Sequence, residues 1–356
     1  MTNSSLNEAV EVGGAGPDDA STATAPPRQF LRAFARVGGL IATIVLVLAV
    51  FAVASNGLIM VPDNLLGLLR YMSTIAIVGL GLTVVLIVGE IDLSFANLYG
   101  LSAMSMAVAW LNWGWPLWLA IVLALAIGVA VGAFNAFFTS VVGIPSFIAT
   151  LGSSTLIFGF NLLISGAQGF APASPPAGKT VSPGEVSLFR GLSNQHLPFG
   201  VPMQVLWMVL IAGIFWVVLN RSLFGFRLRA IGGNAVAARF ARIPVRRYKF
   251  WAFCIAGFAA AVAGLLDFAF IGSIQPDAGQ ALLFPTFAAV VIGGASLQGG
   301  RGSVAGTLLG ALLLAVIANG LALLAAGAFA QQMFLGVVTI GAVVLDQVTR
   351  NWRRDQ

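Results

Sequence analysis

The stretch RSLFGFRLRAIGGNAVAARFARIPVRRYK, residues 221–249, decides how the rest of this chain is arranged. It contains eight of the chain's 18 Lys and Arg residues, has no Asp or Glu, and lies between long apolar runs. Lys and Arg close to the ends of a membrane span resist translocation and remain on the cytoplasmic side. We therefore expect this loop to be cytoplasmic and to set the orientation of every apolar segment around it.

The composition is that of a membrane protein. Over 356 residues it is 59% hydrophobic and only 8% charged, whereas a soluble domain carries roughly 25% charged residues. Residues 93–178 contain no Asp, Glu, Lys or Arg, and a single crossing needs about 20 apolar residues. The sequence pI of about 10.4 does not indicate nucleic acid, because the Arg residues cluster beside apolar spans.

The order of apolar runs and breaks predicts an all-α polytopic membrane protein with about ten transmembrane helices. Ten crossings put the N-terminus, the 221–249 loop and the C-terminus on the cytoplasmic side, where all three Arg-rich segments belong. We predict a disordered cytoplasmic N-terminal tail at 1–36, a transmembrane domain over 37–348 and a cytoplasmic C-terminal tail at 349–356. The sequence Ala52-Val53-Ala54 resembles a signal-peptidase site, but the apolar run before it starts too late for a signal peptide. The predicted spans are residues 37–60, 71–89, 93–111, 117–138, 146–165, 203–220, 250–270, 281–297, 303–324 and 329–348.

Residues 166–202 are rich in Pro and polar residues and predict an external loop. It contains the single histidine, His196, which we interpret as a solvated residue because no Cys or acidic cluster accompanies it. Residues 173–180, ASPPAGKT, approach the phosphate-binding pattern GxxxxGK[ST]. Pro175 and Pro176 remove two of the backbone donors that such a loop needs, so we predict no nucleotide site here. The lone Cys254 lies in an apolar segment and is expected to be a buried packing residue.

Polar residues in or beside the spans are the candidates for function, since nothing in the sequence supports catalysis or a metal site. Glu90 and Asp92 follow Gly89 between two apolar runs. They could face a cavity or partner inside the membrane, or lie in a short inner turn in water. The glycine-rich stretch 292–306 has two corresponding interpretations. It could be non-helical backbone at membrane depth, or a simple turn on the inner side of the membrane. We select as candidate translocation or gate residues Glu90, Asp92, Ser94, Asn97, Thr150, Gln298 and Asn319. Three further polar residues, Asn135, Asn161 and Asp267, are expected to be interhelical contacts.

The two glycine-interrupted stretches lie in separate halves of the chain, one before and one after the basic loop. The second to fifth spans and the seventh to tenth spans are offset by an odd number of crossings. That offset predicts two inverted repeats, an arrangement common in transporters, with the substrate path between the halves.

Four motifs occur in order along the chain: GEIDLS (89–94), GIPSFIATLG (143–152), AIGGNAVAARFARI (230–243) and VVIGGASLQGGRGSVAGTLLGALLL (290–314). In sequence and in order they resemble motifs of the permease subunits of bacterial ABC importers for ribose, xylose, arabinose and related sugars. The resemblance covers nearly all of the chain after residue 37.

The resemblance implies a multi-pass protein of the bacterial inner membrane that translocates a monosaccharide or related small polar solute. It implies a second permease copy, identical or different, a cytoplasmic ATPase that holds ATP-Mg, and a periplasmic or lipid-anchored solute-binding protein. This chain would have no catalytic residue, metal or cofactor of its own. Residues 230–243 would form the helix that docks on the ATPase, with Asn234 as N-cap and Gly232-Gly233 as a flexible lead-in. The residues assigned to coupling are Gly225, Arg229, Gly233, Asn234, Ala238, Arg239 and Arg242.

Two other functional classes are alternatives for a membrane protein with this sequence. An ion-coupled secondary transporter could also have a basic loop between its halves, but the count of ten and the lack of a buried acid–base relay oppose it. An intramembrane enzyme would need Glu90, Asp92 or Asp267 as its catalytic group, and none of these has a basic partner placed by the sequence.

Overall fold

In the computed structural model the chain is helical, which confirms the predicted all-α class. The structure describes residues 28–354, with the side chains of residues 37–344 other than Ala328 and Ala342. Residues 1–38 and 39–356 form two separate units, and the contacts described below are within the second. The only β-structure in the described part is three isolated bridges. The α-helices are α1 (Arg28–Ala54), α2 (Pro62–Ile87), α3 (Phe95–Ala107), α4 (Leu117–Phe137), α5 (Ser146–Ser165), α6 (Pro183–Gly191), α7 (Met203–Arg221), α8 (Leu223–Gly233), α9 (Ala235–Phe240), α10 (Val245–Ile271), α11 (Leu283–Ile292), α12 (Val304–Leu323) and α13 (Ala328–Arg354).

Helices lie at all the positions where spans are predicted, but not all are long enough to cross. Among the described residues, seven helices have the length and apolar composition of a membrane span: α1, α2, α4, α5, α7, α10 and α12. The prediction of a full span over 281–297 is wrong, because α11 has ten residues and measures about 15 Å. The hydrocarbon core is about 30 Å thick. Helix α1 begins at Arg28, before the predicted first span at 37–60, and α13 continues to Arg354, beyond the predicted last span at 329–348.

The two longest buried helices, α2 and α10, are each followed by a non-helical segment and then a short helix. Gly89 follows the end of α2 with φ +84°, and Gly272 ends α10 with φ +76°. Both values lie in the left-handed region that glycine tolerates best. These segments are residues 88–94, before α3, and 272–282, before α11, and the second of them ends in the short 3-10 turn Gln280–Leu282. Such backbone is stable at membrane depth only when protein or a cavity surrounds it.

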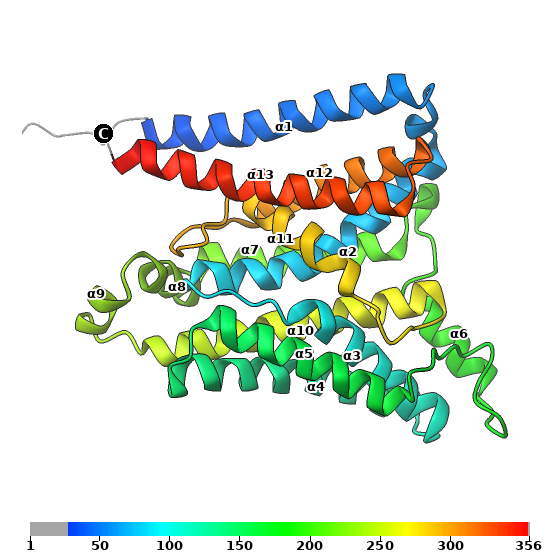
Figure 1. Ribbon diagram of the computed structural model, residues 1–356. Helices are drawn as coiled ribbons and strands as arrows, with labels where there is room; N and C mark the ends of the chain where they lie inside the picture. Colours follow the sequence, from blue (N-terminus) through cyan, green and yellow to red (C-terminus); the bar gives the residue numbers. More distant parts are fainter. Residues whose placement is uncertain (1–27, 355–356) are drawn as a thin grey trace, which may run out of the picture. The chain divides into compact units, whose positions relative to one another are not determined.

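Helix α10 is the centre of the packing and contacts α4, α2 and α3, as Figure 1 shows. Glycines allow this close approach. A Cβ on Gly257 of α10 would overlap the backbone of Gly128 on α4, and Gly132 lies one turn further against Phe253. Small residues at four-residue spacing are a common device for packing membrane helices, because dispersion contacts rather than hydrophobicity drive their association.

The predicted external loop 166–202 is partly structured. It contains α6 and a backbone pairing of Phe170 with Ile274. His196 is exposed, as predicted, and Cys254 is buried and free. The ASPPAGKT stretch has neither a strand before it nor a helix opening from it, and Lys179 is exposed. This geometry agrees with rejecting a phosphate-binding loop.

Candidate translocation and coupling sites

The non-helical segment 88–94 is held by a row of hydroxyl groups on α5. The backbone N–H of Ile91 donates to Ser146 Oγ at 3.0 Å, and the N–H of Leu93 donates to Thr150 Oγ1 at 3.1 Å. Ser154, one turn further, accepts from Asn97 Nδ2 at 2.9 Å. The three hydroxyls are four residues apart and therefore lie on one face of the helix. They satisfy backbone groups that no helix or sheet satisfies, which buried backbone requires.

Asp92 lies inside this segment and is 1% exposed. Its Oδ1 accepts from the backbone N–H of Ser94 at 2.8 Å and from Ser94 Oγ at 2.7 Å. Asn135 Nδ2 on α4 donates to the same Ser94 hydroxyl at 2.7 Å, while Asn135 Oδ1 has no partner among the described residues. The interpretation of Asp92 as a group in a hydrated inner turn is therefore wrong.

Glu90 is also buried, and Lys249 at the start of α10 forms an ion pair with it. The sequence places no base beside Glu90, since the two residues are 159 positions apart. The Glu90–Lys249 ion pair joins the non-helical segment 88–94 to the end of the basic loop 221–249. The hydrated-turn interpretation fails for Glu90 as well, because a buried carboxylate is tolerated only with such a partner.

Three of the motif stretches meet at one glycine junction, formed by Gly89, Gly232, Gly299 and Gly300. The N–H of Gly300 donates to the Ile87 carbonyl at 2.8 Å. A Cβ on Gly232 would overlap both the Ile87 oxygen and the Gly300 nitrogen. The prediction that Gly232 is a flexible lead-in is wrong, because it is a close-packing residue at the end of α8. Gln298, a predicted pathway residue, lies at this junction with its carbonyl next to Gly89.

The predicted coupling residues fall into two groups, Gly225 and Arg229 on α8, which pack on the end of α7, and the residues on or beside the exposed helix α9. Gly225 packs on Leu219 at the end of α7, and Arg229 donates to the Leu219 carbonyl at 2.6 Å. Arg229 thus satisfies a carbonyl at the C-terminal end of α7. Ser222 caps α8 through the Gly225 N–H.

The exposed tip is α9. The predicted N-cap is confirmed, because Asn234 Oδ1 accepts from the N–H groups of Val236 and Ala237 at 3.0 and 2.9 Å. Ala238 is buried, whereas Arg239 and Arg242 are exposed. Arg242 lies beyond the end of α9 with φ +57°.

Two apolar residues of this tip were missed at the level of sequence. Val236 is 60% exposed and Phe240 is 85% exposed. Their spacing of four residues puts them on one face of α9, which is the signal that could have identified them.

A second polar cluster surrounds Asp267 of α10, near the end opposite the glycine junction. Its carboxylate accepts from Tyr99 Oη at 2.5 Å, Thr74 Oγ1 at 3.1 Å and Gln204 Nε2 at 3.1 Å. Arg70 on α2 completes the cluster as an ion pair at 3.4 Å. Asp267 thus links α2, α3, α7 and α10. Among its partners only Arg70 is charged, and the sequence contains no signal that would pair it with a residue 197 positions away.

The remaining predicted pathway residue, Asn319, lies apart from the others. It forms a reciprocal amide pair with Asn64 on α2, at 2.8 and 3.0 Å. The structure therefore brings Glu90, Asp92, Ser94, Asn97 and Thr150 together, places Gln298 at the adjacent junction, and leaves Asn319 outside this group.

The second non-helical segment, 272–282, packs between α3 and α5. Asn161 Nδ2 donates to the Pro276 carbonyl at 2.6 Å. A Cβ on Gly100 would overlap the Ala278 carbonyl, and one on Gly279 would overlap that of Ala96. This segment therefore reaches the first turn of α3, close to where the 88–94 segment ends.

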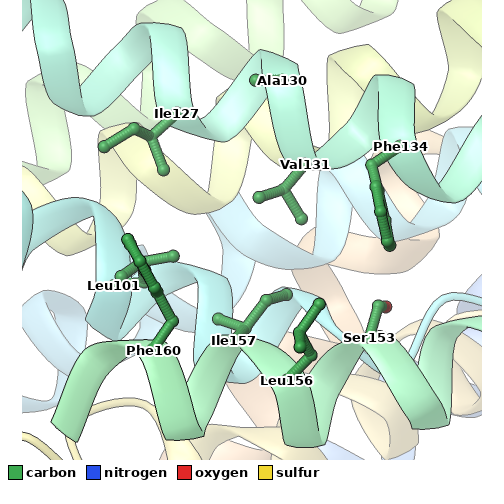
Figure 2. A pocket seen from close by; sticks show the side chains of 9 residues that line it. All are labelled: Leu101, Ile127, Ala130, Val131, Phe134, Ser153, Leu156, Ile157 and Phe160. Carbon is green, nitrogen blue, oxygen red and sulfur yellow. The ribbon is translucent and has the colours of Figure 1, made fainter. Parts of the chain in front are cut away.

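An apolar pocket of about 410 Å³ lies between α4 and α5 (Figure 2). Its lining is hydrophobic except for Ser153, with Phe134 and Phe160 at its sides. Polar solutes need several hydrogen-bonding groups in a site, so this pocket is not suited to a sugar. No group of three or more His, Cys, Asp or Glu side chains suited to a metal is found among the described residues.

Comparison with known proteins identifies the family. Residues 64–343 match the family described as "Branched-chain amino acid transport system / permease component". The chain belongs to this permease family. It is 35% identical over 286 residues to the ribose import permease RbsC of Bacillus subtilis, covering 80% of this chain and 85% of that protein.

Two further relatives are similar over most of their length. The xylose transport system permease XylH of Escherichia coli is 30% identical over 361 positions, covering 87% of this chain and 91% of that protein. The autoinducer 2 import system permease LsrD of Klebsiella pneumoniae is 38% identical over 247 residues, covering 69% and 72%.

Membership of the permease family confirms the resemblance drawn from the four motifs. The chain is a multi-pass membrane permease and a non-catalytic component of an ABC import system. The secondary-transporter and enzyme alternatives are excluded by this assignment. No catalytic role is therefore assigned to the buried carboxylates Glu90, Asp92 and Asp267.

Proposed function

We propose that this permease carries a monosaccharide or a related small polar solute, with energy from a separate ATPase that docks on α9. The family description names branched-chain amino acids, but the relatives named above import ribose, xylose or autoinducer 2. These solutes are small and rich in hydroxyl groups. The proposed system also contains a second permease copy, identical or different, and an external solute-binding protein.

The observation that carries the docking role is the exposed apolar face of α9. Phe240 and Val236 project from a six-residue helix whose first turn is fixed by the Asn234 cap. An exposed apolar patch with a polar rim is typical of a protein–protein contact site, and Val236 and Phe240 form such a pair on one helix face. Aromatic anchors commonly dominate the binding energy of interfaces. Arg239 and Arg242 flank this face and suit acidic groups on the ATPase.

The proposed topology has ten membrane-embedded helices, with the termini and the α8–α9 segment in the cytoplasm. The links 88–94, 221–249 and 293–303 meet at the glycine junction, as three inner links of such a topology should. Two inverted repeats are supported by element order. In each, a long helix (α2 or α10) precedes a linking segment, a short helix and two further helices. Short or interrupted helices at matching positions of two repeats indicate the solute path.

The docking role is tested by replacing the apolar anchors. Val236→Ala with Phe240→Ala should leave insertion unchanged, while co-purification of the ATPase and ATP-dependent uptake fall at least tenfold, since central anchors contribute about 2 kcal/mol or more. Phe199→Ala is the matched control, because Phe199 is fully exposed in the 166–202 loop and should not affect ATPase co-purification. Normal co-purification by the α9 variant would refute the assignment.

The solute class is tested separately through the external binding protein. Purified binding protein from the same import system should bind a pentose, hexose or related polyol, measured by thermal shift across a solute panel. Uptake of the best ligand into vesicles should require ATP. Binding of only branched-chain amino acids would refute the sugar assignment without affecting the docking role.

A further inference from the structure

Two adjoining hollows meet at Trp251 near the start of α10. The first, of about 330 Å³, is lined by Phe224, Arg227, Pro244, Arg247, Tyr248 and Trp251. The second, of about 310 Å³, is apolar and is lined by residues of α7 and α10 that include Phe215, Trp251 and Phe258. Trp251 belongs to both linings, and its side chain is 47% exposed. A basic hollow therefore adjoins an apolar groove at this side chain.

The basic hollow carries positive charge that no carboxylate in the described part of the chain neutralises. The ion pairs found among the described residues are Arg70–Asp267 and Glu90–Lys249. Neither pair involves Arg227 or Arg247. Arg227 Nη1 donates to Tyr248 Oη at 2.6 Å, and its guanidinium lies 5.8 Å from the centre of the same ring. This contact fixes one guanidinium in position and leaves its other N–H groups available to an anion.

The apolar groove extends away from these arginines along α10. From Trp251 to Phe258 it covers about 10 Å at 1.5 Å per residue. Its wall contains no charged side chain. A hydrated anion or an acidic protein side chain could occupy the basic hollow but could not fill this groove. A ligand with both an anionic head and a hydrocarbon tail matches the pair.

We propose that this composite site binds an anionic phospholipid of the inner leaflet, with its phosphate at Arg227 and Arg247 and one acyl chain in the α7–α10 groove. The proposal rests on the cytoplasmic placement of the 221–249 loop in the proposed function. Basic pockets beside membrane helices on the cytoplasmic side attract anionic headgroups, and Trp and Tyr at this level match the interfacial belt. The lipid would brace α8 against α10, next to the α9 docking face.

The test uses the full-length permease reconstituted in phosphatidylcholine bilayers, with photoreactive phosphatidylglycerol or phosphatidylcholine labelled on an acyl chain. Phosphatidylglycerol should cross-link to peptides covering 211–218 and 251–258, and unlabelled phosphatidylglycerol should compete. Soluble glycerol phosphate should not compete, which separates a lipid from a free phosphate. Equal labelling of these peptides by both lipids would indicate ordinary surrounding lipid and overturn the proposal.

Charge variants provide the matched comparison. Arg227→Gln with Arg247→Gln should lower specific cross-linking about 25-fold, since each arginine near an anionic surface contributes roughly fivefold. Arg239→Gln with Arg246→Gln removes the same charge outside the hollow and should leave it unchanged. Arg227→Lys with Arg247→Lys keeps the charge and should retain most of the specific cross-linking. This variant also shows that replacing the two arginines does not by itself disrupt the fold. Equal losses in the Gln pair and the control pair would overturn a specific site.

Failure of the lipid proposal is distinguishable from failure of the topology beneath it. In a chain with Cys254→Ser, a Phe240→Cys variant should react with an impermeant maleimide only in inside-out vesicles. Labelling from the opposite side would refute the topology and the lipid site together. If Phe240→Cys is labelled only in inside-out vesicles but both lipids cross-link equally well, the lipid site alone would be refuted.

Discussion

At the scale of single residues, glycine decides how closely backbones approach in this permease. Gly232 has neighbours on both sides, the Ile87 carbonyl and the Gly300 N–H, with no room for a Cβ. The adjacent Gly233 has open space around its Cβ position. Two glycines that look equivalent in the sequence therefore have different roles, since only the first is needed for packing.

This difference yields a prediction with an internal control. Gly232→Ala should strongly reduce the yield of folded permease or lower its melting temperature, because backbone atoms cannot yield as a side chain can. The expected cost is on the order of 2–3 kcal/mol, typical of overpacking. Gly233→Ala should raise stability slightly, by less than about 1 kcal/mol, because alanine has the higher helix propensity. Fluorescence-detected size exclusion after heating measures both, and equal stability of the two variants would contradict the junction.

At the scale of elements, the hydroxyl row of α5 explains how an unwound segment is stable inside the bundle. Ser146 and Thr150 accept hydrogen bonds from the backbone N–H groups of Ile91 and Leu93, and Ser154 accepts one from the Asn97 side chain just beyond the segment. The same helix has a threonine outside this row. Thr155 donates only to the Leu151 carbonyl, and this contact is exposed.

The two threonines of α5 provide a matched pair of variants. Thr150→Val keeps the shape of the side chain but removes the acceptor for the Leu93 N–H, which leaves a buried donor unpaired. We expect a loss of about 1–3 kcal/mol and reduced transport, since the segment that carries Asp92 is released. Thr155→Val should leave both melting temperature and uptake unchanged. Identical behaviour of the two variants would show that the hydroxyl row does not stabilise the segment.

At the scale of the whole molecule, Asp267 connects helices from both halves of the chain. Its carboxylate receives four donors from three other helices. Its side chain is 12% exposed and that of Arg70 is 24% exposed. Removal of Asp267 would leave a guanidinium, a phenol, a threonine hydroxyl and an amide in the bundle without their shared acceptor.

We therefore expect Asp267→Ala to destabilise the permease by about 3 kcal/mol, as for a buried pair that loses one partner. Asp267→Asn keeps an acceptor oxygen and should cost less. Asp277→Ala is the control, because Asp277 is exposed in the 272–282 segment and lies outside the cluster. Thermal unfolding of the purified variants gives the order, and a melting temperature for Asp267→Ala equal to that of Asp277→Ala would contradict the role of this cluster.

Local features of the sequence determined the class of the protein and much of its layout. Apolar runs predicted where the helices lie, because span length and hydropathy are properties of consecutive residues. The same is true of the Asn234 cap, which acts within three residues. The four motifs were sufficient to indicate the permease family.

Only the tertiary structure decided which polar groups meet. The pairs Glu90–Lys249 and Arg70–Asp267 join residues 159 and 197 positions apart, and the shortness of α11 was likewise visible only in the structure. The roles of Gly232 and Trp251 likewise depend on neighbours from other helices. Charge bias and helix propensity act over short stretches of chain, whereas these contacts depend on how distant helices pack.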